Sequence, residues 1–171
     1  EGFIDWQAFE HPDLGEVEIG GFTRYWLRSP PPGPFLRKVV QDQARFAVVR
    51  GLLTPLVNIQ GVEVSGGGEP DEWLITATVA NEGYLDTSTE QGRRTGTAQP
   101  DRVTLELGEG VTTEDSPTVS FPFMRGTRES EFVSLYRASW TVRGSEGSRI
   151  SVTVRSEKGG ADSRTVTLRV G

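Results

Sequence analysis

The chain has 171 residues, enough for one domain of ordinary size or a domain with an appendage, and too few for a large enzyme barrel. Its formal net charge of −6 argues against nucleic acid as a partner, because phosphate binding requires a basic face. The absence of cysteine and the presence of a single histidine, His11, exclude disulfides, zinc fingers and any zinc site that needs two imidazoles.

Residues 1–34 are predicted to form an irregular segment that contains one short strand, Glu16–Ile19. The segment is rich in aromatic residues, but their spacing is mixed and glycine and proline recur among them. Three consecutive prolines at 30–32 end it, because proline lacks an amide donor and restrains the residue before it. The next segment, residues 35–54, is predicted to be a helix. Its apolar residues recur at spacings of three and four, and Thr54-Pro55 supplies a stop.

From residue 55 onward the apolar pattern has a period of two, which is typical of half-buried antiparallel strands. The alternating sets are Val57/Ile59, Val62/Val64, Trp73/Ile75/Ala77/Val79, Val103/Leu105/Leu107, Val119/Phe121/Phe123, Phe132/Tyr136/Ala138/Trp140/Val142, Ile150/Val152/Val154 and Val166/Leu168/Val170. The parity changes at Gly61, which predicts a bulge or a strand that changes sheets. We therefore expect an all-β fold over residues 55–171, an immunoglobulin-like antiparallel sandwich of roughly seven or eight strands.

Several residues have a structural role as their simplest interpretation. Trp73 and Trp140 have apolar neighbours and are expected to anchor the core. Gly66–Gly68 is expected at a hairpin tip, because no Gly-Lys-Ser/Thr follows and no helix begins there. The Val-x-Asn-x-Gly element in residues 79–83 resembles a turn common in adhesion-like and cell-surface β-sandwiches, which implies positive backbone angles at Asn81 and Gly83.

Carboxylates and His11 are the residues that could carry chemistry. His11 is followed by Pro12 and Gly15, which make a helical zinc motif improbable and favour a structural role. Glu16 and Glu18 alternate along one strand, so they are a candidate glycosidase pair or, more simply, two solvated side chains. Calcium at strand-connecting loops stays open, although no Asp-x-Asp-x-Asp-Gly array is present. The aspartates concerned are Asp13, Asp71, Asp86, Asp101, Asp115 and Asp162.

The segment Phe3–Phe22 contains the run His11-Pro12-Asp13-Leu14-Gly15-Glu16-Val17-Glu18-Ile19-Gly20-Gly21. It resembles a stretch that follows the catalytic core of a group of bacterial zinc carboxypeptidases. The similarity continues through Ser29–Pro32, the predicted helix and Val79–Thr87. In that family the zinc ligands, a His-x-x-Glu pair and a later histidine, and the general-base glutamate lie upstream of this stretch. None of these motifs can be placed on the present sequence.

The resemblance implies a non-catalytic C-terminal accessory domain of a zinc metallocarboxypeptidase-like protein, which stabilises the enzyme or positions it on substrate or surface. The chain itself is expected to hold no catalytic residue, metal or cofactor, and zinc is expected in the parent catalytic domain. That domain, in the same chain, is the expected partner of residues 1–34, and the family implies an extracellular or periplasmic location. The expected interface residues are Phe3, Trp6, Phe9, His11, Leu14, Glu16, Glu18, Tyr25 and Trp26.

Other functions are compatible with a sandwich, because fold does not fix function. A standalone module that binds carbohydrate, a cell-surface glycan or a protein ligand would need exposed aromatic residues in one plane, and Tyr25, Trp26 and Tyr84 are the candidates. An enzyme built from Glu16 and Glu18, or a structural oligomerisation domain, is a further alternative. No apolar run approaches the roughly 20 residues that a membrane-spanning helix needs.

Overall fold

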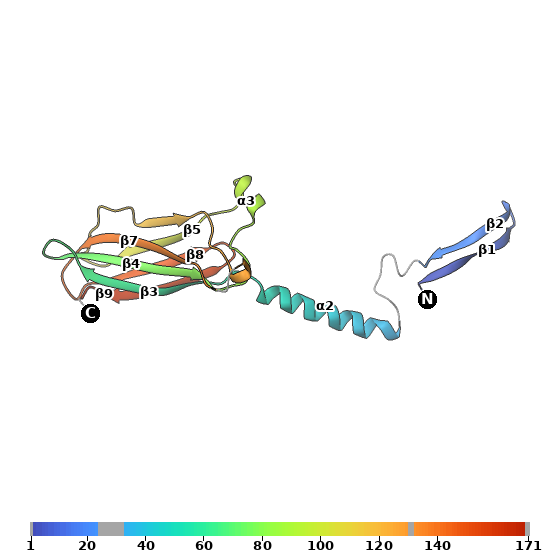
Figure 1. Cartoon of the computed structure of the whole chain (residues 1–171), viewed down its shortest axis with the longest axis horizontal. Coiled ribbons are helices and arrows are strands. Elements are labelled where there is room, and N and C mark those ends of the chain that lie inside the picture. Colours follow the sequence, from blue (N-terminus) through green and yellow to red (C-terminus); the bar gives the residue numbers. More distant parts are fainter. Residues whose placement is uncertain (1, 24–32, 130–131, 170–171) are drawn as a thin grey trace. The chain divides into compact units, whose positions relative to one another are not determined.

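The structure is a computed structural model that describes residues 2–23, 33–129 and 132–169 (Figure 1). The chain divides into two units, Glu1–Arg50 and Gly51–Gly171. Strands dominate the described residues, and every pair of neighbouring strands is antiparallel. The predicted all-β class is confirmed.

The second unit consists of two antiparallel sheets (Figure 1). One sheet has the order β3 (Val57–Gly66), β4 (Glu72–Asn81) and β7 (Leu135–Arg143). The other has the order β6 (Thr118–Phe121), β5 (Asp101–Leu107), β8 (Arg149–Ser156) and β9 (Gly160–Thr167). Along the chain, β3 and β4 belong to the first sheet, β5 and β6 to the second, β7 returns to the first, and β8 and β9 complete the second. Two antiparallel sheets connected in this way are typical of immunoglobulin-like sandwiches.

The core lies between the two sheets and is built from the alternating apolar residues that the sequence indicated. Val79, Val142 and Val152 are fully buried, and they come from both sheets. Trp73 and Trp140 are also buried, and the indole of each donates a hydrogen bond to a backbone carbonyl, of Gly144 and Ser116 respectively. Both tryptophans therefore anchor the core as predicted, with their polar atoms satisfied.

Three strand ends differ from the prediction. β6 ends at Phe121 because Pro122 follows, so Phe123 lies in the loop beyond. β7 begins at Leu135, and Phe132 is outside it with 80% of its surface exposed. β9 begins at Gly160, well before Val166, and Val170 lies outside the described residues.

The parity change at Gly61 is a bulge, as predicted, because the β3–β4 register shifts between Ile59 and Gly61. At this bulge the edge strand β3 makes contacts with β9, the edge strand of the other sheet. The amide of Ile59 donates to Asp162 Oδ2 at 2.9 Å, and Arg164 donates to the carbonyl of Gln60 at 3.3 Å. The bulge thus links the two sheets along one side of the sandwich.

The expectation of positive backbone angles at Asn81 and Gly83 is wrong. Among the described residues, positive φ occurs at Asp71 and at seven glycines that do not include Gly83. Gly83 is needed for another reason: a Cβ there would lie 2.3 Å from the carbonyl oxygen of Thr54. Asn81 is completely buried and serves as a hydrogen-bonding hub for the surrounding loops.

The first unit contains a hairpin of β1 (Phe3–His11) and β2 (Gly15–Phe22), followed by all but the last two residues of helix α2 (Pro34–Leu52). Residues 1–34 were expected to be irregular with a short strand at Glu16–Ile19, and the hairpin corrects this. The helix occupies nearly the predicted range. Most of its side chains are exposed, and no helix of the described residues is long and apolar enough to cross a membrane.

Candidate functional site

The hairpin of β1 and β2 is the candidate functional site, because it carries most of the residues that the sequence placed at an interface. Phe3, Trp6, Phe9 and His11 lie on β1. Glu16 and Glu18 lie on β2, and Leu14 lies in the connecting turn. The two remaining candidates, Tyr25 and Trp26, lie outside the described residues.

The hairpin turn is organised by His11. Its Nδ1 atom accepts hydrogen bonds from the backbone amides of Asp13 at 3.1 Å and Leu14 at 3.2 Å. An imidazole nitrogen that accepts a hydrogen bond carries no proton, so in this arrangement His11 uses Nδ1 for the turn and not for a metal. The structural interpretation of His11 accounts for this geometry.

A bulge in β1 explains the Gly20-Gly21 pair. The register shifts between Ile4 and Gln7, so Asp5 and Trp6 face Gly20. A Cβ on Gly20 would lie 2.7 Å from Trp6 Cα, a backbone atom that cannot move aside. Gly21 has φ of 103°, a conformation that side chains disfavour. Both glycines are therefore required by the local backbone.

One face of the hairpin is apolar. Residues paired directly across the strands share a face, which places Phe9 with Val17 and Gln7 with Ile19. Beyond the bulge, Ile4 joins this face opposite Gly21. Phe9 and Ile19 keep 44% and 42% of their surface exposed among the residues that the structure describes. We call Ile4, Phe9, Val17 and Ile19 the apolar face.

The opposite face is acidic near the turn. Glu10 pairs directly with Glu16, and Glu18, paired with Ala8, is the next residue on the same side. Like charges that face each other across two strands destabilise an isolated hairpin. Glu16 and Glu18 do lie on one face, as the alternation predicted, and both are exposed. A glycosidase needs its two carboxyl groups on opposite sides of the bond to be cleaved, whereas these two lie exposed on the same strand, so this geometry does not favour a glycosidase pair.

The aromatic residues of the hairpin do not form one plane. Phe3 and Phe22 pair edge-to-face, with ring centroids 5.0 Å apart, at the open end of the acidic face. Phe9 belongs to the apolar face, and Trp6 in the bulge is 61% exposed. A partner must therefore contact more than one side of the hairpin to cover all of them.

Four of the six aspartates considered for calcium accept hydrogen bonds within the sandwich. Asp86, Asp115 and Asp162 each accept a hydrogen bond from a backbone amide. Asp101 is buried and accepts from the hydroxyl of Thr87. Within the part of the chain that the structure describes, no three side chains of His, Asp or Glu come together as metal ligands. Tyr84, the described candidate of the three proposed for carbohydrate, is 43% exposed.

Residues 56–167, more than half of the chain, match a family described as Domain of unknown function (DUF8731). The chain belongs to this family. The DUF8731 match begins immediately before β3 and ends with β9, so it coincides with the sandwich. A comparison with curated proteins finds no match.

The hairpin lies outside the DUF8731 match, and so does α2. A feature of the DUF8731 sandwich itself was not predicted from the sequence. The loop between β4 and β5 contains a short helix, α3 (Glu90–Arg94), and the loop after β6 contains a 3-10 turn, η1 (Thr127–Glu129). Thr89 caps α3, because its side chain accepts a hydrogen bond from the amide of Gly92. The signal that could have predicted this helix from the sequence is Thr89 followed directly by Glu90.

Proposed function

We propose that this chain is a non-catalytic accessory region of a zinc metallocarboxypeptidase-like protein, in which the hairpin docks on the catalytic domain and the sandwich is the appended module. The observation that carries the proposal is the apolar face of the hairpin, which is exposed among the described residues. It lies within the segment Phe3–Phe22 that resembles the stretch following the catalytic core in that family.

The stability of the hairpin supports a docking role. A two-stranded hairpin is marginal in water unless a further strand or layer covers its apolar face. Full burial of a Phe or Ile side chain contributes roughly 1.5–3 kcal/mol, so covering Phe9 and Ile19 would offset much of the ordering cost. In the described part of the chain the hairpin is a sheet of two strands, so its outer edges can extend a partner's sheet.

The partner that fits this hairpin has two chemical features. It presents an apolar surface to the apolar face and basic side chains to Glu10, Glu16 and Glu18, whose mutual repulsion it relieves. In this proposal zinc belongs to the catalytic domain, because the only imidazole of the present chain already holds the turn. The family parentage would place the chain in the extracellular or periplasmic space.

The test is a binding measurement between the 171-residue chain and the zinc carboxypeptidase-like domain encoded in the same gene, produced as a separate protein. We expect a specific complex that Phe9→Ser weakens by at least about tenfold, because a buried Phe is worth more than 1.4 kcal/mol. Leu74→Ser is the matched control, since Leu74 is 43% exposed but lies on the sandwich. We also expect no release of C-terminal amino acids from a peptide by the chain alone.

A gene that encodes no such domain, or a complex that Phe9→Ser and Leu74→Ser weaken equally, would contradict the proposal. Circular dichroism of both variants should show an intact sandwich, because neither side chain belongs to the buried core.

A further inference from the structure

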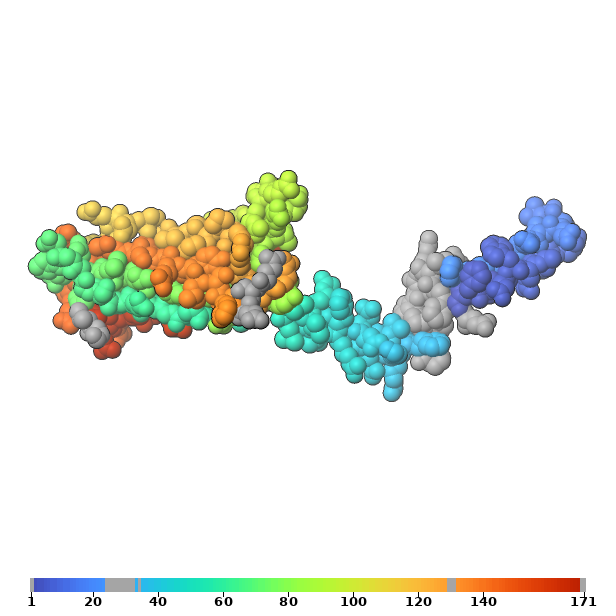
Figure 2. Space-filling model, viewed as in Figure 1, coloured from blue at the N-terminus to red at the C-terminus, as the bar shows by residue number. Residues whose placement is uncertain are grey.

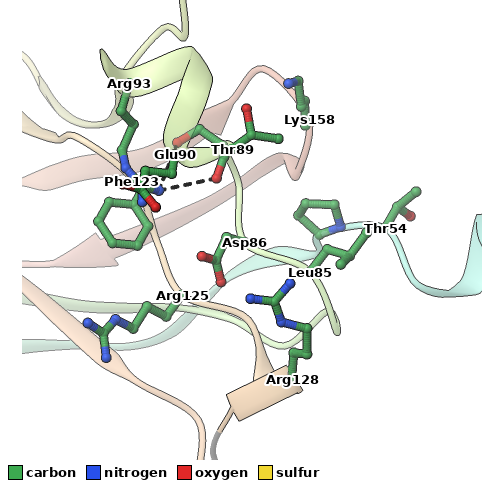
Figure 3. Close-up of a pocket in the computed structure, with 12 residues that line it drawn as sticks. Thr54, Leu85, Asp86, Thr89, Glu90, Arg93, Phe123, Arg125, Arg128 and Lys158 are labelled. Carbon is green, nitrogen blue, oxygen red and sulfur yellow. Dashed lines mark hydrogen bonds between the residues drawn. The ribbon is translucent and has the colours of Figure 1, made fainter.

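A cavity of about 760 Å³ opens at the end of the sandwich where the loop containing α3, the loop after β6 and the β8–β9 turn come together (Figure 3). Its volume is within the range of small-molecule sites. In immunoglobulin-like sandwiches the loops gather at the two ends, and binding residues are found there more often than on the sheets. Figure 2 shows α3 standing out from the body of the sandwich at this end.

The charged residues that line the cavity are mainly basic. They are Arg93, Arg125, Arg128 and Lys158, against Asp86 and Glu90. This excess of positive charge occurs in a chain whose net charge is −6. Among the described residues, ion pairs join Lys38 to Asp42 and Arg143 to Glu72, and neither involves Arg93, Arg125 or Lys158. Within the described part of the chain, Arg93, Arg125 and Lys158 therefore form no ion pair with the protein's own carboxylates.

Arg93 is held in place for binding. Its guanidinium carbon lies 3.8 Å from the centroid of the Phe123 ring, and its Nη1 donates to the carbonyl of Ser88 at 3.2 Å (Figure 3). Ser88 is buried, so this anchor is fixed. A guanidinium that is stacked on one face and bonded at one nitrogen retains donors for a planar anion without a large entropy loss.

The acidic side chains decide what kind of anion fits. Asp86 accepts the amide of Gly126 through Oδ1, and in Figure 3 it points toward Arg128. Asp86 and Glu90 would repel a bare inorganic anion, but their oxygens accept hydrogen bonds from ligand hydroxyls. Leu85 and Pro55 add apolar surface to the lining. The cavity thus combines donors for a carboxylate, acceptors for hydroxyls and an apolar wall.

We propose that this cavity binds an acidic saccharide, with Arg93 and Arg125 as donors to its carboxylate and Asp86 and Glu90 as acceptors of its hydroxyl groups. The proposal concerns the sandwich alone and does not depend on the docking of the hairpin. A uronic acid unit has the required chemistry, because one ring bears both a carboxylate and several hydroxyls.

The test is calorimetric titration of the whole 171-residue chain with trigalacturonate at about 0.15 M ionic strength, where exposed charges are largely screened. We expect saturable binding of trigalacturonate. Arg125→Gln or Arg93→Gln should each weaken the affinity about tenfold, because each removes one charge-assisted hydrogen bond. Arg149→Gln is the matched control. It removes the same charge, and Arg149 lies at the start of β8, at the other end of the sandwich. Arg125 is exposed, so its replacement leaves the fold intact even if Arg93→Gln disturbs α3.

Three further titrations separate the possible ligands. Neutral galactotriose should bind at least tenfold more weakly than trigalacturonate, and triglutamate and inorganic phosphate should do the same. Equal binding of triglutamate would show that a carboxylate suffices, and equal binding of phosphate would show a general anion site; either result overturns the proposal. Equal weakening by Arg149→Gln and Arg125→Gln, or no binding of trigalacturonate at millimolar concentration, also overturns it.

Discussion

Asn81 shows how a single buried polar side chain can define a set of loops. Its Oδ1 accepts from the amides of Leu56 at 2.9 Å and Gly83 at 3.0 Å. Its Nδ2 donates to the carbonyls of Leu85 at 2.8 Å and Met124 at 3.3 Å. One amide group therefore satisfies backbone atoms at the entry to β3, in the loop after β4 and in the loop after β6, next to the proposed saccharide cavity.

Replacing Asn81 should destabilise the sandwich strongly. Asn81→Ala leaves several buried backbone groups without partners, and we expect a loss of about 3 kcal/mol in the free energy of unfolding. Asn58→Ala is the control, because Asn58 donates to Glu82 on the exposed surface and its loss should cost about 0.5 kcal/mol or less. Urea unfolding of both variants measures the difference, and similar midpoints for the two would show that Asn81 is not a hub.

Asp42 provides a second prediction at the scale of one residue. Its hydrogen bond to Lys38, one turn earlier in α2, and the nearby charges of Lys38 and Arg45 lower its pKa below the usual Asp value. A lowered folded-state pKa means that the contribution to helix stability is present above the ordinary Asp pKa and is lost as the pH falls through the lowered value. The effect should be small because the pair is exposed.

The measurement is an NMR titration of the Asp42 carboxyl carbon. Lys38→Gln should move its midpoint upward, toward the ordinary Asp range. Lys158→Gln should leave it unchanged, because the hydrogen bond and the charges that lower this pKa come from Lys38 and Arg45. A midpoint that does not respond to Lys38→Gln would exclude the hydrogen bond as the cause.

At the scale of the element, the hairpin depends on the fit between its bulge and Gly20. Gly20→Ala would bring a Cβ to 2.7 Å from Trp6 Cα, so the two strands must separate or slip. We expect the nuclear Overhauser contacts between Phe9 and Val17 to disappear in this variant. Gly51→Ala is the control, because a Cβ there meets nothing within 4 Å, and it should leave the hairpin unchanged. Retention of the Phe9–Val17 contacts in Gly20→Ala would contradict the observed bulge.

The strands that the sequence predicted are those in which apolar and polar residues alternate and the apolar side of the strand is buried. In β8 every apolar residue of the alternating set is buried, so its period of two is clear. β9 was predicted only in part, because its first residues, Gly160–Thr165, are mostly exposed at a sheet edge and include no large apolar side chain. β1 was not predicted, because the bulge at Asp5 and Trp6 breaks the alternation of its aromatic residues.

The hairpin and the cavity also differ in how far the sequence alone could predict them. The residues of the hairpin are close in sequence, so a motif could indicate them, although their faces depend on the bulge. The cavity is assembled from loops far apart in the chain, and the stacking of Arg93 on Phe123 depends on tertiary structure that no local pattern encodes. The only indication of the cavity in the sequence is that several arginines lie between the predicted strands.

At the scale of the whole molecule, the sandwich contains all that its own stability requires. Its core residues run from Val57 to Leu168, and none of them belongs to the unit Glu1–Arg50. The DUF8731 match covers the same part of the chain. The loop residues Leu53 and Thr54 also belong to this unit, since the carbonyl of Leu53 accepts from the amide of Leu85. A protein consisting of residues 51–171 should therefore fold without the hairpin.

We expect residues 51–171 to unfold cooperatively with a Tm within about 2 °C of the sandwich transition in the full chain, because no core contact is removed. Starting instead at Val57 should lower the Tm, because it removes the carbonyl of Leu53 and the amide of Leu56, which bond to Leu85 and Asn81. Thermal unfolding followed by circular dichroism compares the three proteins. A large loss of stability in residues 51–171 would mean that the hairpin or α2 packs on the sandwich, and the apolar face would then need no external partner.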